Sequence, residues 1–157
     1  MSDRLAELRA TLANEMPVTQ HLGIEVVGRR EEGPLLRAPL ASNRNHQGTA
    51  FGGSLNAIAT LACWSAIWLA LREAEAPGIV VIQDSTIRYL RPVTTDFTAV
   101  ADLSALKIEQ LMATIRRRGR GRITVTATVS DAAGPAVTFT GRYVVASNPS
   151  LPKDRPS

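Results

Sequence analysis

The sequence predicts a single α+β domain in which a curved antiparallel sheet lies against one long central helix. Three observations lead to this prediction. The chain has 157 residues, which is the length of about one domain. No residue from Thr49 to Leu71 is charged, as expected of a helix that is buried on nearly every side. The second half of the chain is rich in β-branched residues separated by short turns, which is typical of antiparallel strands.

The first part of the chain predicts one helix followed by two strands. A helix is expected over about residues 3–14, because leucines recur there at helical spacing. Pro17 restricts the residue before it and ends this helix. Residues 22–29 and 35–40 are predicted as strands, since a turn-forming Glu-Glu-Gly-Pro segment separates them. Residues 41–51 are rich in asparagine and glycine and lack periodicity, so we expect a loop there.

The uncharged segment predicts the central helix, which runs over about residues 53–73. Its length would also suit a membrane span. We favour the buried helix of a globular domain, because Asn56, Thr60 and Ser65 interrupt the apolar run. Alanine is also abundant in this segment, which suits close packing against other parts of the protein.

The rest of the chain predicts four more strands and a short helix. The strands are expected at residues 79–90, 97–106, 122–130 and 136–146, and the helix at 107–116. The third of these strands alternates apolar residues with threonines, as a half-buried strand does. The domain is therefore expected to span residues 1–147, and residues 148–157, with their three prolines, are expected to form a flexible tail.

The predicted architecture leaves sheet edges and part of a sheet face uncovered. Open edges are usually paired or protected, so we expect a homodimer or a dimer of dimers. The single cysteine excludes an internal disulfide, which fits a reducing compartment. The N-terminal segment lacks the apolar core of a signal peptide, so we expect a cytoplasmic protein.

The formal net charge of +4 has a local origin. Five arginines and no acid stand between Ile115 and Ile123, and the rest of the chain is close to neutral. The five are Arg116, Arg117, Arg118, Arg120 and Arg122. Such a patch indicates an anionic partner, such as a phosphate group or an acidic protein surface. The alternative interpretation is a solvated turn.

The polar loop that leads into the central helix is the candidate site. It brings Gly52 and Gly53 to the helix N-terminus, where free N–H groups and the helix dipole favour an anion or a developing oxyanion. Asn45 carries an amide donor that would complete an oxyanion hole from the side. The alternative is that the Asn45 side chain only ties the loop to its own backbone.

Three motifs characterise this loop and the strand region that follows it. The loop motif is Asn43-x-Asn45-x-x-Gly48-Thr49-x-Phe51-Gly52-Gly53-Ser54-Leu55, and the later motifs are Ile82-Gln83-Asp84-Ser85 and Ile87-Arg88-Tyr89-Leu90-Arg91-Pro92. These motifs resemble those of the hot-dog fold thioesterase superfamily, in particular the branch described as "putative thioesterases", and the resemblance covers about residues 17–146. The resemblance implies a hot-dog fold and an enzyme that acts on acyl thioesters. Members of this branch act as malonyl-acyl carrier protein decarboxylases at the start of fatty-acid synthesis.

The resemblance also implies roles for individual residues. The catalytic-loop asparagine of the family falls on Asn45. The glycine whose amide faces the thioester carbonyl falls on Gly52, with Gly53 beside it. Many hydrolytic relatives have a histidine where this chain has Phe51, and a carboxylate on the central helix where it has Thr60.

The missing carboxylate favours decarboxylation over hydrolysis. Hydrolysis at neutral pH needs a group that activates water or attacks the thioester, and residues 53–71 contain no carboxylate. Decarboxylation of a malonyl thioester needs a stabilised enolate and a poorly solvated carboxylate, which an oxyanion hole in an apolar cleft provides. The predicted catalytic residues are Asn45, Gly52, Gly53 and Thr60, and the predicted substrate-binding residues are Asn43, Phe51, Asn56, Arg116, Arg117 and Arg118.

Other functions remain as alternatives. One is hydrolysis of acyl-coenzyme A or acyl-carrier protein thioesters, with Asp84, or Glu73 of the partner subunit, as the base. Another is a non-catalytic module that binds acyl thioesters. We expect the acyl carrier protein or coenzyme A to deliver the substrate, with the arginine run as the docking surface of the carrier. No cofactor or metal is expected, since the phosphopantetheine arm belongs to the substrate, and neither nucleic acid nor a membrane is an expected partner.

Overall fold

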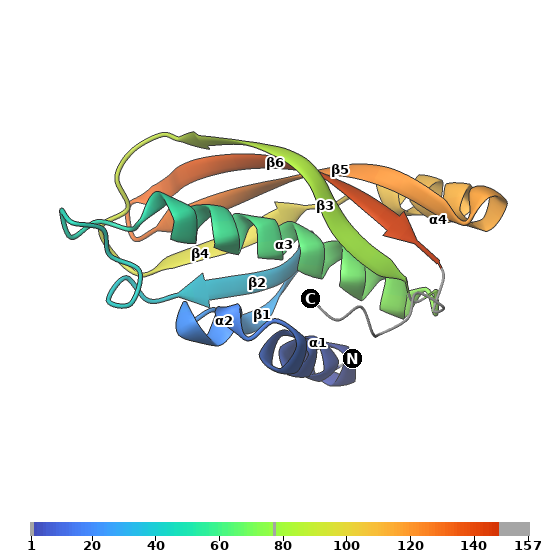
Figure 1. The fold of residues 1–157 in the computed structure, drawn as a ribbon, viewed down its shortest axis with the longest axis horizontal. Coiled ribbons are helices and arrows are strands. Elements are labelled where there is room, and N and C mark those ends of the chain that lie inside the picture. The colour runs from blue at the N-terminus through green and yellow to red at the C-terminus, as the bar shows by residue number, and fades with distance from the viewer. Residues whose placement is uncertain (1, 77, 148–157) are drawn as a thin grey trace, which may run out of the picture.

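The computed structural model describes residues 2–76 and 78–147, so the predicted tail at 148–157 lies outside the described residues. Six antiparallel strands form one curved sheet in the order β1-β2-β4-β5-β6-β3, with the long helix α3 on its concave side (Figure 1). This confirms the predicted α+β architecture. The elements are α1 (Ser2–Glu15), α2 (Val18–His21), β1 (Glu25–Arg30), β2 (Gly33–Ala38), α3 (Gly52–Glu73), β3 (Ile79–Tyr89), β4 (Phe97–Asp102), α4 (Ala105–Arg118), β5 (Arg120–Asp131) and β6 (Gly134–Ala146).

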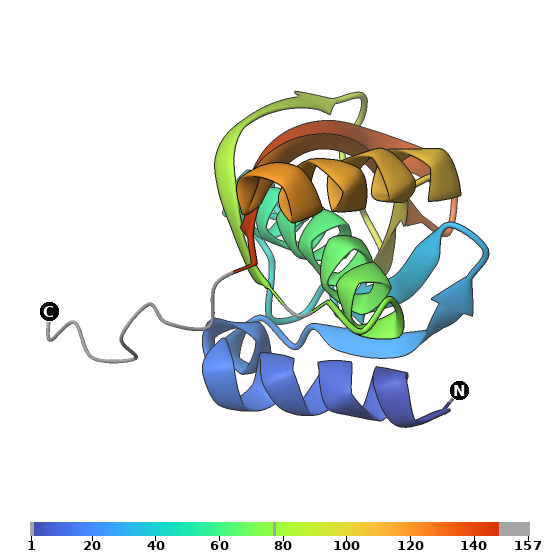
Figure 2. The same ribbon diagram turned by 90° about the vertical axis from the view of Figure 1, so that its right-hand side faces the viewer.

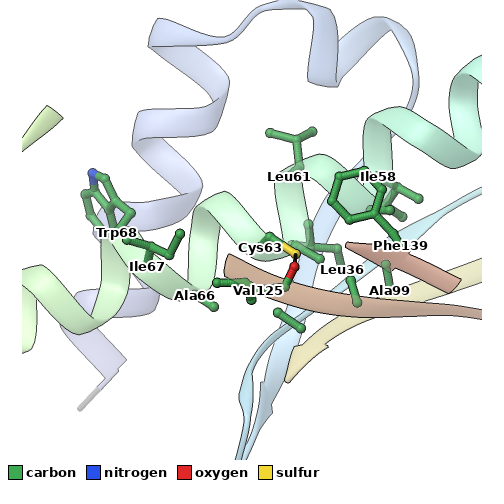
Figure 3. Packing of buried hydrophobic residues seen from close by; sticks show 14 of the residues in the cluster. Leu36, Ile58, Leu61, Cys63, Ala66, Ile67, Trp68, Ala99, Val125 and Phe139 are labelled. Atoms are coloured by element: carbon green, nitrogen blue, oxygen red, sulfur yellow. Dashed lines mark hydrogen bonds between the residues drawn. The ribbon is translucent and has the colours of Figure 1, made fainter. Parts of the chain in front are cut away.

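Helix α3 forms the centre of the hydrophobic core. It is long and apolar enough to cross a membrane, but 72% of its most apolar 18-residue stretch is buried inside the protein. Its side chains pack against residues from four strands of the sheet, including Leu36, Ala99, Val125 and Phe139 (Figure 3). The absence of charge between residues 49 and 71 is therefore explained by contact with the sheet.

Helix α4 is longer than the sequence predicts. Strand β4 ends at Asp102 rather than at residue 106, and α4 begins at Ala105 rather than at residue 107. Ser104 is the reason for the earlier start, because its Oγ accepts a hydrogen bond from the backbone N–H of Lys107 at 3.3 Å, as an N-cap residue does. Gly119, with φ of 76°, ends the helix. Residues 116–118 are consequently its last turn.

A short helix between α1 and β1 was not expected. Helix α2 follows Pro17, whose φ of −60° suits the start of a helical turn. The Oγ1 of the buried Thr19 donates a hydrogen bond to the carbonyl of Leu12 at 3.3 Å, which ties α2 to α1. Four residues are too short for a hydrophobic period to show in the sequence.

The two edges of the sheet differ. Strand β1 has six residues and a bulge between Val26 and Gly28, and the Nε of Arg9 on α1 donates a hydrogen bond to the carbonyl of Val26 at 2.9 Å. Figure 2 shows α1 running beside this edge. Strand β3 has 11 residues and, within the part of the chain that the structure describes, pairs only with β6. The β3 edge is therefore the more exposed of the two.

Candidate functional site

The candidate site lies where a polar loop enters the N-terminal end of α3. Backbone hydrogen bonds fix this loop: the N–H of Phe51 donates to the carbonyl of Asn43 at 2.7 Å, and the N–H of Ala50 donates to Val93 at 2.9 Å. The Oδ1 of Asp96 accepts a hydrogen bond from the N–H of Leu40 at 2.9 Å. The loop is thereby attached to the segment that joins β3 to β4.

Gly52 and Gly53 are the first two residues of α3. The carbonyl of the N-cap residue Phe51 accepts hydrogen bonds from the N–H groups of Ser54 at 3.0 Å and Leu55 at 3.1 Å. Within residues 2–76 and 78–147, the N–H groups of Gly52 and Gly53 have no hydrogen-bond acceptor, either in the helix or outside it. These two N–H groups lie at the positive end of the helix dipole, so they can bind an oxyanion.

Neither glycine has a positive φ, so only close contacts would oppose an added side chain, and these differ between the two positions. A Cβ atom on Gly53 would overlap Cε1 of the exposed Phe51 ring, which therefore covers this residue. A Cβ atom on Gly52 would lie 3.4 Å from the Tyr89 hydroxyl, an ordinary contact. The surroundings of the two N–H groups are thus partly aromatic.

Asn45 is tied to its own loop. Its Nδ2 donates a hydrogen bond to Oγ1 of Thr49 at 2.8 Å, and its Oδ1 accepts from the N–H groups of Gln47 at 2.9 Å and Thr49 at 3.2 Å. The loop-tying role that the sequence leaves open is therefore present. One of the two Nδ2 hydrogens takes part in these bonds, and the carboxamide keeps a second N–H that it can donate.

The structure revises the role predicted for Asn43. Asn43 is only 3% exposed, and its Nδ2 donates hydrogen bonds to the carbonyls of Leu22 and Pro39, both at 2.7 Å. The amide that was predicted to bind substrate is thus used inside the protein. Asn43 holds the base of the loop against the end of α2 and the segment after β2.

Asn56 and Thr60 lie together on α3, as their spacing predicts. Both are half-buried, and Oγ1 of Thr60 donates a hydrogen bond to Oδ1 of Asn56 at 3.2 Å. The Nδ2 of Asn56 has no acceptor among the described residues. Neither side chain ionises near neutral pH, so this pair can donate hydrogen bonds to a ligand but cannot act as a base.

Tyr89 was not predicted as a site residue, although it is part of a quoted motif. It stands at the end of β3, is half exposed, and its hydroxyl donates a hydrogen bond to the carbonyl of Gly52 at 3.0 Å. This bond attaches the sheet edge to the first turn of α3. The residue type gives no hint of it, because the contact joins positions 37 residues apart.

A second contact that the sequence does not reveal braces the segment after β3. The guanidinium of Arg91 donates hydrogen bonds to both carboxylate oxygens of Asp131, at 2.6 and 3.1 Å. The Asp131 side chain is fully buried, and it also accepts from the N–H groups of Thr94 and Ala133. These bonds lower the pKa of Asp131 from 3.8 to about 2. The bond from Arg91 has the largest effect, and the two N–H donors have smaller ones.

The two carboxylates considered for hydrolysis are both in ion pairs. Asp84 pairs with Arg142 on β6, and Glu73 pairs with Arg29 on β1. Glu73 closes the 22-residue helix that Gly52 opens, which puts roughly 30 Å between the two ends. Within one chain, neither carboxylate is next to the glycine pair.

The predicted substrate-binding arginines are not brought together with the glycines in one chain. Arg116, Arg117 and Arg118 form the last turn of α4 and are exposed. Figure 1 shows α4 and the loop before α3 at opposite ends of the long axis of the molecule. The chemistry of the arginines and of the glycine pair suits one substrate, but the sequence does not show how far apart they lie.

Metal-binding side chains do not cluster in the described part of the chain. Among residues 2–76 and 78–147, no three His, Cys, Asp or Glu side chains stand close enough together to hold a metal ion. That the reaction uses neither metal nor cofactor stays a prediction.

A long helix enclosed by a curved antiparallel sheet is the architecture of the hot-dog fold, and this protein has that fold. The model of the family described as "Putative thioesterase (yiiD_Cterm)" matches residues 5–147. The chain belongs to this family. The family recognised from the sequence motifs is thereby confirmed.

Solved structures with this fold are similar over nearly the whole chain. A protein of unknown function from Chlorobaculum tepidum TLS is 27% identical with a TM-score of 0.87, over 92% of this chain and 94% of that one. A protein from Shewanella oneidensis, described as a putative thioesterase, is 28% identical with a TM-score of 0.83, over 93% and 99%. A thioesterase from Haemophilus influenzae shares the fold at 21% identity, with a TM-score of 0.71 over 91% and 90%.

Proposed function

We propose that this protein is an acyl-thioester enzyme that decarboxylates the malonyl group carried by acyl carrier protein. One observation carries the proposal. Two N–H groups, of Gly52 and Gly53, are free to bind an oxyanion, while α3 has no carboxylate before Glu73. The family description and the name of the Shewanella protein support a thioester as the substrate.

The reaction follows from these donors. The thioester carbonyl oxygen accepts hydrogen bonds from the N–H groups of Gly52 and Gly53, and the second Nδ2 hydrogen of Asn45 serves as a third donor. The bond between the malonyl methylene and its carboxylate breaks, carbon dioxide leaves, and the electron pair forms an enolate whose negative oxygen these donors stabilise. Water then gives a proton to the methylene carbon, and the product is the acetyl thioester.

The aromatic surroundings favour loss of the carboxylate. The Phe51 ring lies over Gly53 and the Tyr89 ring lies against Gly52. Apolar rings beside the reacting group reduce the solvation of the malonyl carboxylate, and this raises the energy of the charged reactant more than that of neutral carbon dioxide. Replacement of the histidine found in hydrolytic relatives by Phe51 is consistent with this role.

Hydrolysis of an acyl thioester is the second candidate, because the family and its Shewanella member carry the name thioesterase. It needs a base, and Asp84 and Glu73 are already in ion pairs. A parallel assay separates the two reactions. With malonyl-carrier protein and a saturated acyl-carrier protein as substrates, we expect carbon dioxide from the first and little free thiol from the second. Free thiol from both would support hydrolysis, and binding without turnover would support the non-catalytic module.

Replacing Gly52 by proline tests the oxyanion hole directly. Proline has no N–H, and it suits the first position of a helix. The preceding Phe51 has φ of −64° and ψ of 131°, which is the conformation that a residue before proline adopts. We expect Gly52→Pro to lower kcat about 100- to 1,000-fold, measured as carbon dioxide release from malonyl-carrier protein.

Gly52→Ala is the matched control, because it adds the same Cβ contact with Tyr89 and keeps the N–H. Its kcat is expected to stay within about fivefold of the wild type. Equal losses in the two variants would remove Gly52 from the oxyanion hole and attribute the effect to the added side-chain atoms.

We also propose that the protein acts as a cytoplasmic homodimer, alone or as a dimer of dimers, without a cofactor of its own. The exposed 11-residue edge of β3 supports the dimer, because long open edges pair with other strands. Burial of α3 in the core supports a location outside the membrane.

A further inference from the structure

A run of five arginines without an acidic residue lies at the junction of α4 and β5. We call Arg116, Arg117, Arg118, Arg120 and Arg122 the α4 arginine cluster, and all five are exposed. Within residues 2–76 and 78–147 none of them forms an ion pair, and the one side-chain bond is from Nε of Arg122 to Oε1 of Gln83 at 3.0 Å. The cluster therefore has unused positive charge.

The shape of the cluster fits a broad partner. Three successive residues of a helix point in directions about 100° apart, so Arg116, Arg117 and Arg118 cannot converge on a single phosphate group. Beside them, a cavity of about 240 Å³ between α4 and β5 is lined partly by Lys107 and Arg122 and by no acidic side chain. A wide basic surface of this kind suits an acidic protein.

The cluster is far from the glycine pair of its own chain. The sheet register places Arg120 next to Ala146 of β6, and Ala146 next to Ile79 at the start of β3. The glycine pair lies at the other end of β3, where Tyr89 contacts Gly52. An 11-residue strand spans about 36 Å, so a partner docked on the cluster would stand almost a molecule's length from this site.

Pairing of two β3 edges changes this distance. An antiparallel pair related by a two-fold axis near the middle of β3 places the Tyr89 end of one strand opposite the Ile79 end of the other. From Tyr89 to Arg120 of the partner subunit there are then three inter-strand steps, across β3, β6 and β5 of the partner, or about 14 Å. The last turn of α4 joins β5 at this end, so the cluster approaches the glycine pair of the other subunit.

We propose that the α4 arginine cluster of each subunit docks the acidic carrier protein whose acyl chain reacts at the glycine pair of the other subunit. The proposal rests on the proposed function for the identity of the substrate. It explains why the cluster and the site lie at opposite ends of one chain, and it makes the dimer necessary for turnover of carrier-linked substrates.

Subunit complementation tests this arrangement. One chain carries Gly52→Pro and the other carries Arg116→Gln, Arg117→Gln and Arg118→Gln, and the heterodimer is isolated with two different affinity tags. Docking across the interface leaves one complete site, formed by the intact glycine pair and the intact cluster of the other chain. We expect about half of the wild-type kcat/KM for malonyl-carrier protein, while each variant homodimer loses at least about tenfold.

The matched control redistributes the same substitutions. All four are placed in one chain, which is paired with a wild-type chain. Docking across the interface then leaves no complete site, so we expect activity as low as that of the variant homodimers. The reverse result, with activity in this heterodimer and none in the first, would show docking within one subunit and overturn the proposal. Equal activity in both would overturn it too, because the carrier would then bind elsewhere.

A cross-linking experiment tests the geometry without any assay of activity. Tyr89→Cys in one chain and Arg120→Cys in the other introduce thiols about 14 Å apart across the proposed interface, whereas the natural Cys63 is buried. A bis-maleimide of that span is expected to link the two chains, and neither variant alone is expected to react with its own copy. Linkage, together with an absence of thioester turnover in the wild-type protein, would contradict the proposed function and keep the arrangement of subunits. Absence of linkage would contradict the arrangement itself.

Discussion

Asn45 illustrates how one carboxamide can hold a loop and still keep a donor for a substrate. Its Oδ1 accepts two backbone N–H groups, and one Nδ2 hydrogen is bonded to Thr49. Substitution by alanine would remove the loop contacts together with the donor, so it would not separate the two roles. An isosteric change can separate them, because the oxygen and the nitrogen of the amide have different tasks.

We predict that Asn45→Asp lowers kcat for malonyl-carrier protein at least about 100-fold and changes the free energy of unfolding by less than about 1 kcal/mol. The aspartate keeps the acceptor for the N–H groups of Gln47 and Thr49, and the Thr49 hydroxyl can donate to its carboxylate. The N–H donor to the enolate is replaced by a negative charge. Steady-state kinetics at pH 7 and denaturant unfolding provide the two measurements.

Thr49→Val is the complementary control for this prediction. It removes the partner of Nδ2 and leaves the Asn45 donor in place, so it is expected to cost about 1 kcal/mol of stability and only a few-fold in kcat. A larger loss of kcat in Thr49→Val than in Asn45→Asp would mean that Asn45 acts only through the loop.

The candidate site could be located from the sequence to the extent that its parts are local. A glycine pair ahead of an uncharged helix identifies Gly52 and Gly53 without tertiary information. Asn43 belongs to the same motif, but its burial depends on the carbonyls of Leu22 and Pro39, which the fold brings to it. Tyr89 escapes prediction for a related reason, because its contact with Gly52 depends on how β3 curves over α3.

At the level of elements, the segment between β3 and β4 connects the site to the rest of the sheet. Arg91 holds this segment to Asp131 at the end of β5, and the carbonyl of Val93 in the same segment accepts the N–H of Ala50 in the site loop. The position of the glycine pair therefore depends on an ion pair whose members are 40 residues apart.

This ion pair predicts a specific loss of stability in acid. Bonds from Arg91 and two backbone N–H groups lower the pKa of Asp131 from 3.8 to about 2 in the folded protein. A lowered folded-state pKa gives stability that is fully present above about pH 4 and is lost as the pH falls from there to about 2. We expect the free energy of unfolding of the wild type, measured by denaturant titration, to fall more steeply across this window than that of Asp131→Asn.

Asp131→Asn should also be less stable at pH 7 by about 1–3 kcal/mol, because Arg91 loses its charged partner. An equally steep decline in both proteins between pH 4 and pH 2 would assign the acid sensitivity to other carboxylates. Asp96 is one of these, since its bonds to the Leu40 N–H and then to Arg37 also lower its pKa.

Helix α4 shows which element boundaries a sequence can supply. The apolar side chains of Leu111, Met112 and Ile115 face the sheet and were sufficient to indicate a helix. The sequence predicts its start too late, because the β-propensity of residues 97–106 extends the predicted strand past Asp102 and over Ser104. The cap is a local feature of the sequence. A serine directly before an amphipathic segment indicates a helix start, even where β-propensity favours a strand.

For the whole molecule, the asymmetry of the two sheet edges decides how copies can associate. The short β1 edge is bulged and lies beside α1, whereas β3 presents 11 residues with only β6 as a described neighbour. The sequence predicts that an edge is paired, but it cannot say which one, because the strand order depends on contacts between distant segments. Once β3 is identified as the open edge, pairing of two copies along it explains how the arginine cluster of one subunit can serve the glycine pair of the other.

The last prediction concerns this edge and uses two matched variants. Val81 on β3 and Val27 on β1 are both exposed, at 55% and 43%, and a lysine on an edge strand opposes pairing with another strand. We expect Val81→Lys to raise the dissociation constant of the dimer by up to about 30-fold, since two symmetric substitutions each cost up to about 1 kcal/mol. Val27→Lys should leave it unchanged, as sedimentation at several protein concentrations would show.

If dimers are needed for docking, the diluted Val81→Lys variant also loses turnover of malonyl-carrier protein while its circular dichroism stays that of the wild type. If Val27→Lys dissociates the dimer and Val81→Lys does not, the interface lies on β1. The arginine cluster of one subunit would then not lie near the glycine pair of the other, contrary to the proposal.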